Sequence, residues 1–205
     1  RHGRGQRPLR RLTAEPPPET VRSMQNTLRE IEEHPDIGIT MTDGTRLSAR
    51  LWKPVDAGDD PVPLILEYLP YRKRDGTCAR DALTHPYFAA RGYACLRVDI
   101  RGNGDSHGLM TDEYTQQELE DAAEVIHWAA AQDRCTGAIG MMGISWGGFN
   151  SLQVAAMAPP PLKAIITLCS TVDRYADDIH YKGGCLLNEN LGWGATMWSY
   201  SSRAP

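Results

Sequence analysis

The chain has 205 residues, of which 41% are hydrophobic and 23% are charged, a composition typical of a folded domain with a sizeable core. Its formal net charge of -4 argues against nucleic acid or an anionic membrane surface as the main partner. No stretch approaches the roughly 18 apolar residues that a transmembrane helix needs. The five cysteines are widely spaced and form neither a C-x-x-C pair nor a zinc-ligand pattern, which favours a reducing, cytoplasmic location.

The N-terminal region changes composition along its length. Residues 1–18 are rich in arginine and proline and have no apolar stretch, which predicts a disordered leader, with a basic arm or transit-like tail as the alternative. Residues 19–34 predict a solvated helix. Apolar and polar residues then alternate over 37–54, on both sides of Asp43-Gly44, which predicts two short strands joined by a tight turn.

From residue 63 onward, predicted strands and helices alternate. Buried strands are expected where apolar runs are continuous, and helices where apolar residues recur at helical spacing. The expected strands are 63–68, 93–100, 137–144 and 162–169, and the expected helices are 80–92, 115–132 and 147–158. Thr115 and Glu118 form a capping box at the start of the second helix. This order predicts an α/β fold with a mostly parallel, doubly wound sheet.

A G-x-S-x-G pattern places Ser145 between Gly143 and Gly147, after a predicted strand and before a predicted helix. In a nucleophile turn of this kind, the positions two before and two after the serine pass so close that only small residues fit. The backbone N–H of Trp146, at the helix N-terminus, would then face a developing oxyanion. The hydroxyl of Tyr71, which follows the strand 63–68, could supply a second donor. The alternatives are a structural glycine-rich turn and a packing aromatic.

The stretch 98–108 also contains closely spaced glycines. Their spacing does not fit G-x-G-x-x-G and no helix opens directly behind them, so a dinucleotide site is not indicated. A tight loop tied by Asp99 and Arg101 is the favoured interpretation.

Several stretches together resemble the acyl hydrolases grouped with cocaine esterase, α-amino-acid ester hydrolases and X-Pro dipeptidyl peptidases. They are EYLPYRKRD, HPYFAARGYACLRVDIRGNGDS, GMMGISWGGFNSLQVAA, LKAIITLCSTVDRYADDIHYKGG and NENLGWG. The resemblance implies an α/β-hydrolase core over 35–171 and the start of a helical cap over 172–205. It also implies Ser145 as the nucleophile, with the Tyr71 hydroxyl and the Trp146 backbone N–H as oxyanion contacts. A small-molecule ester or amide substrate is implied, and no metal or organic cofactor.

The acid and the histidine of the triad follow the cap in this family, so the resemblance implies that they lie beyond residue 205. The chain is therefore expected to be the N-terminal part of a serine hydrolase, truncated after about six strands. Downstream of Ser145, the candidates within the chain are Asp173, Asp177, Asp178, His180 and Glu189. His180 follows Asp173 by only seven residues, and one short segment would hardly bring both to the serine. A polar cap entrance is the expectation for them, and a catalytically silent binding domain is the alternative for the whole chain.

Overall fold

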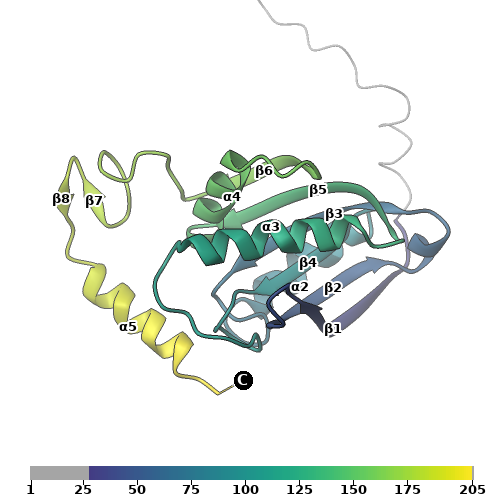
Figure 1. Ribbon diagram of the computed structural model, residues 1–205, viewed down its shortest axis with the longest axis horizontal. Coiled ribbons are helices and arrows are strands. Elements are labelled where there is room, and N and C mark those ends of the chain that lie inside the picture. Colours follow the sequence, from purple (N-terminus) through teal and green to yellow (C-terminus); the bar gives the residue numbers. More distant parts are fainter. Residues whose placement is uncertain (1–27, 205) are drawn as a thin grey trace, which may run out of the picture.

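The computed structural model describes residues 28–204, and its centre is a six-stranded sheet with helices on both faces (Figure 1). The sheet order is β1-β2-β4-β3-β5-β6. Neighbours from β4 to β6 pair in parallel, whereas β1 pairs with β2, and β2 with β4, in antiparallel register. In chain order the strands are β1 (Ile31–Thr40), β2 (Arg46–Pro54), β3 (Val62–Leu69), β4 (Ala94–Asp99), β5 (Cys135–Ile144) and β6 (Leu162–Leu168).

Two sets of helices cover the two faces of the sheet. In Figure 1, α3 (Gln116–Ala130) and α4 (Trp146–Ala156) lie in front of the sheet and α2 (Cys78–Ala89) lies behind it. A short 3-10 helix, η1 (Val55–Gly58), follows β2. The expected α/β fold with a doubly wound, mostly parallel sheet is therefore confirmed.

The hydrophobic core consists of two clusters, one on each face of the sheet, because alternate side chains of a strand point to opposite faces. On β4, Cys95 packs with Trp52 and Ala89 of α2, while its neighbour Leu96 belongs to the larger cluster on the other face. That larger cluster joins apolar residues of β3, β4 and β5 to α3 and α4. Successive residues of a strand point to opposite faces, so a strand buried on both faces is mostly apolar, and its buried polar side chains, such as that of Arg97 on β4, need polar partners.

The predicted helix over 19–34 is wrong where the structure describes it. Residues 31–34 belong to β1, and residues 19–27 lie outside the described part. Strand pairing with β2 overrides the polar, helix-like composition, because Glu33 gains partners that a solvated helix would not offer. Its carboxylate accepts from the Arg50 guanidinium at 2.6 Å and from the Trp52 indole at 2.9 Å. Pro35 sits at the register shift of this edge strand, where a missing N–H does least harm.

After β6 the chain leaves the sheet and forms a small hairpin, β7 (Tyr181–Lys182) and β8 (Cys185–Leu186), followed by α5 (Asn190–Ser201). Figure 1 shows this segment extending beyond the end of α4. The strands of the hairpin are exposed, as expected for a segment without a buried strand. That it begins a cap stays a prediction. Among the helices within residues 28–204, none has the length and apolar character to cross a bilayer.

Candidate active site

Ser145 occupies the single residue between β5 and α4. Its backbone has φ 52° and ψ −116°, a region in which residues other than glycine are strained. Two backbone hydrogen bonds hold this conformation. The Ser145 N–H donates to the Leu168 carbonyl of β6 at 2.8 Å, and the Ser145 carbonyl accepts from the Phe149 N–H at 2.9 Å. The predicted strand-to-helix turn is confirmed, and the serine at its tip is half-buried.

Two glycines let the turn close. A Cβ added to Gly143 would lie 2.7 Å from the Cα of Gly147 and closer still to the carbonyl group of Gly147. A Cβ added to Gly147 would lie 2.8 Å from Cδ2 of Leu69 on β3. The end of β5 therefore passes the start of α4 at a distance that any larger side chain at position 143 would prevent.

Tyr71 reaches the same turn from the loop after β3. The Trp146 N–H donates to the Tyr71 hydroxyl at 3.2 Å, a contact that joins residues 75 positions apart. Parallel strands bring their carboxyl ends to one edge of a sheet, which explains why loops after β3 and β5 meet. Burial raises the pKa of the Tyr71 phenol, while the neighbouring Ser145 side chain and Trp146 N–H oppose that rise. The phenol thus stays protonated around neutral pH and keeps a proton to donate.

Aromatic side chains surround this meeting point. The rings of Trp193 and Tyr200 on α5 lie 6.1 and 6.2 Å from the ring of Tyr71. The ring of Tyr114 lies 5.1 Å from that of Trp146. The buried guanidinium of Arg72 anchors the end of α5, because it donates to the backbone carbonyl of Tyr200 in the last turn and to those of Arg203 and Ala204 just after the helix.

The loop over 98–108 supports the segment that carries Tyr71. Asp99 accepts from the Lys73 N–H at 2.8 Å and from the Asp105 N–H at 3.2 Å. Arg101 pairs with Asp121 at 2.6 Å, so the expected tight loop tied by Asp99 and Arg101 is confirmed. Asp99 therefore fixes the backbone of Lys73, two positions after Tyr71.

Residues 43–205 match the X-Pro dipeptidyl-peptidase (S15) family, and this match covers well over half of the chain. The chain belongs to that family. The cocaine esterase of Rhodococcus sp. (strain MB1 Bresler) is 34% identical over 164 residues, which cover 79% of this chain and 28% of the relative. A CocE/NonD family hydrolase from Staphylococcus aureus has a TM-score of 0.71 and 25% identity, over 86% of this chain and 34% of that one.

An α-amino acid ester hydrolase shares the fold, with a TM-score of 0.67 and 22% identity over 84% of this chain and 31% of that one. The S15-family chain thus spans about a third or less of the length of each of these proteins. The resemblance seen in the sequence is confirmed at the level of the family and of its fold.

The candidate acids and the candidate histidine of this S15-family chain are engaged within the segment after β6. His180 lies 3.0 Å from a carboxylate oxygen of Glu189 through its Nδ1. The aspartates are held by local partners: Asp173 by the Ala176 N–H, Asp177 by Lys182 and Asp178 by Arg174. Within residues 28–204, no hydrogen bond joins Ser145 to a histidine. The structure therefore does not bring these candidates to the serine.

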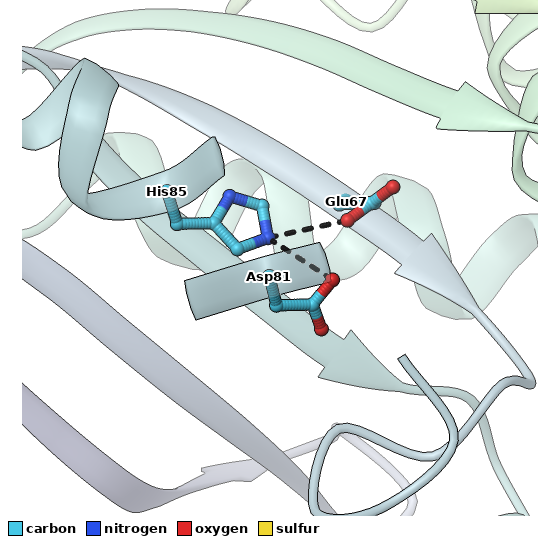
Figure 2. Close-up of side chains that lie close together, drawn as sticks. All are labelled: Glu67, Asp81 and His85. Atoms are coloured by element: carbon cyan, nitrogen blue, oxygen red, sulfur yellow. Dashed lines mark ion pairs between the residues drawn. The ribbon is translucent and has the colours of Figure 1, made fainter. Parts of the chain in front are cut away.

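Glu67, Asp81 and His85 lie together between β3 and α2 (Figure 2). The Nε2 atom of His85 is 3.2 Å from Glu67 and 4.0 Å from Asp81, a spacing that could suit a metal ion. However, two guanidinium groups already form ion pairs with these carboxylates. Arg80 pairs with Glu67 at 2.7 Å and with Asp81 at 2.8 Å, and buried Arg97 reaches Asp81 at 3.3 Å. The group fits a neutralised ion cluster that fastens α2 to the sheet better than a site for a divalent cation.

The sequence predicts only a capping role for Glu118. The Thr115 hydroxyl does accept from the Glu118 N–H at 3.2 Å, as expected for the start of α3. The Glu118 carboxylate, however, also accepts from the indole of Trp146 and from the side chain of Asn150. A capping pattern carries no information about a partner 28 or 32 residues away, so this part of the site was missed.

Proposed function

We propose that this S15-family protein is a serine acyl hydrolase that cleaves an ester or amide bond through an acyl-enzyme on Ser145. One observation carries the proposal. A serine held in a strained turn, a backbone N–H at a helix N-terminus and a tyrosine hydroxyl meet at the carboxyl edge of the sheet. These groups are a candidate nucleophile and the two donors that its oxyanion requires.

Each group has a defined part in this reaction. The Ser145 oxygen attacks the substrate carbonyl, its proton passes to a histidine base, and negative charge moves onto the carbonyl oxygen. The Trp146 N–H and the Tyr71 O–H donate to that oxygen. In the free protein the Tyr71 oxygen accepts from the Trp146 N–H, so the substrate oxygen would take over this N–H while the phenol proton turns toward it. The alcohol or amine then leaves with the proton, and water hydrolyses the acyl-enzyme.

We propose that the base and the acid follow the expected cap, outside the 205 residues, as the family resemblance implies. The pairing of His180 with Glu189 supports this assignment, because it ties that histidine within the segment after β6. The family resemblance implies a small-molecule ester or amide as the substrate. All five cysteines are free, which fits the proposed cytoplasmic location.

Steady-state kinetics test the proposal on protein expressed from the complete coding sequence. Hydrolysis of p-nitrophenyl acetate should fall by several orders of magnitude in Ser145→Ala, since a serine triad without its nucleophile keeps only residual catalysis. Ser151→Ala is a matched control, because this buried serine on the same helix donates only to the Gly147 carbonyl. Undiminished hydrolysis in Ser145→Ala would refute the proposal. No hydrolysis of any ester or amide by the parent protein would favour the binding-domain alternative.

A further inference from the structure

We propose that Glu118 is a positioning residue for the reaction at Ser145. Its carboxylate fixes the indole of Trp146 and thereby the direction of the backbone N–H that faces the reacting carbonyl. This inference rests on the proposed function, since a direction matters only if that N–H contacts an oxyanion. It adds a residue to the site that contacts neither the substrate nor the serine.

The Glu118 carboxylate accepts three hydrogen bonds. Its Oε1 accepts from the Trp146 indole nitrogen at 2.6 Å and from the Asn150 side-chain nitrogen at 2.7 Å. Its Oε2 accepts from the Tyr114 N–H at 2.9 Å. The two bonds to Oε1 are shorter than an ordinary N–H···O bond, as is typical when the acceptor is ionised.

The chemistry of the three donors explains why a carboxylate stands here. An indole nitrogen, an amide nitrogen and a backbone N–H can each donate but not accept. Two acceptor oxygens therefore satisfy all three. A glutamine at position 118 would keep one oxygen and place an NH2 group against the Tyr114 N–H or against the pair formed by Trp146 and Asn150.

Burial makes the placement costly. Glu118 is 6% exposed, and burial raises the pKa of its carboxyl group, while the hydrogen bonds from Trp146, Asn150 and Tyr114 oppose that rise. Among the ion pairs of residues 28–204, none includes Glu118. Burying a carboxylate without a cationic partner costs free energy, because the charge loses its hydration. Such groups concentrate at functional sites.

The position of Trp146 makes the contact relevant to catalysis. It is the first residue of α4, directly after Ser145, and its side chain is 4% exposed. Asn150 lies about one turn further along the same helix. A single carboxylate oxygen thus ties the first two turns of α4 to α3. This contact limits rotation of the peptide group that carries the Trp146 N–H. An oxyanion donor must be held within a few tenths of an ångström to be fully effective.

Kinetics of three variants and one control test the inference, in protein expressed from the complete coding sequence. Glu118→Gln removes the ionised acceptor, Trp146→Phe removes the indole donor but keeps the backbone N–H, and the third variant combines both. Glu120→Gln is the control, because it makes the same change at an exposed position of α3. For each, kcat and KM for p-nitrophenyl acetate are measured per active site, with sites counted by a fluorophosphonate titration.

We expect each single variant to lower kcat about 10-fold or more while KM changes less than about threefold, because a misdirected oxyanion donor weakens the transition state most. The double variant should lose no more than the worse single one, since both changes break the same contact. Glu120→Gln should match the parent. If Glu118→Gln fails to fold, Trp146→Phe alone decides by the same criterion.

Single variants with parental kcat per active site would overturn the inference, and so would losses that multiply in the double variant. A rise in KM at constant kcat would overturn it as well. These outcomes leave the proposed function standing as long as Ser145→Ala abolishes hydrolysis. If Ser145→Ala retains hydrolysis, the proposed function fails first, and the inference fails with it.

Discussion

Replacing Gly143 with alanine should push the end of β5 away from the start of α4 and displace both Ser145 and the Trp146 N–H. The added Cβ would lie 2.7 Å from the Cα of Gly147 and nearer still to its carbonyl group. These are backbone atoms, which cannot rotate away as a flexible side chain could. Overpacking costs about 1–3 kcal/mol, and a backbone collision puts this substitution at the upper end. A shift on the order of 1 Å at the reacting groups can lower kcat about 100-fold.

Gly140→Ala provides the matched comparison on the same strand. Its added Cβ would lie 3.8 Å from the Ala164 carbonyl oxygen, an ordinary contact. Urea unfolding and p-nitrophenyl acetate hydrolysis should be measured for both variants, with kcat expressed per folded molecule. We expect Gly143→Ala to lose both stability and activity, and Gly140→Ala to stay within about 1 kcal/mol of the parent. Parental stability and kcat in Gly143→Ala would refute the account of the turn.

Removing the Tyr71 hydroxyl in Tyr71→Phe should lower kcat about 10²–10³-fold with little change in KM, because an oxyanion donor acts mainly in the transition state. A kcat within about threefold of the parent would show that Tyr71 only packs. The 205-residue chain alone should hydrolyse p-nitrophenyl acetate barely at all, because no histidine within residues 28–204 is hydrogen-bonded to Ser145. Robust hydrolysis that Ser145→Ala abolishes would contradict this expectation and make His180 the candidate base. Burial alone would raise the pKa of Glu67, but His85, Arg97 and Arg80 hold it below its ordinary value. The ionised form therefore stabilises the fold at neutral pH, and this contribution is lost over the acidic window below the ordinary value of 4.5. Glu67→Gln should lower the free energy of unfolding at pH 7 and flatten its dependence on pH over that window, whereas unchanged urea midpoints would contradict the role of the cluster.

The turn at Ser145 could be predicted because its determinants are local. An apolar strand, small residues on both sides of the serine and a helical pattern behind it all fall within residues 137–156. The main strands and helices between residues 37 and 169 follow from the same local periodicity, whereas β7, β8 and α5 were not predicted from it. The meeting of Tyr71 with Trp146 came from the family resemblance, and the parallel order of β3 and β5 gives it a physical reason.

The remaining features depend on partners that are distant in the sequence. Residues 31–34 are polar enough to suggest a helix, and only pairing with β2 makes them a strand. The sequence around Glu118 indicates only a helix cap. The contacts of its carboxylate with Trp146 and Asn150 arise only when α4 packs against α3. Arg72 likewise resembles a surface residue, yet it is buried and donates to backbone carbonyls at and just after the end of α5. No local pattern encodes such contacts.

Identification of the residue that a fluorophosphonate probe modifies tests the central claim most directly. The probe reacts with a serine only where a base activates it and donors stabilise the resulting charge. Protein from the complete coding sequence should carry one phosphonyl group, located by peptide mass spectrometry on the peptide that contains Ser145, and Ser145→Ala should carry none. An unmodified protein, or a phosphonyl group on any other residue, would contradict the account.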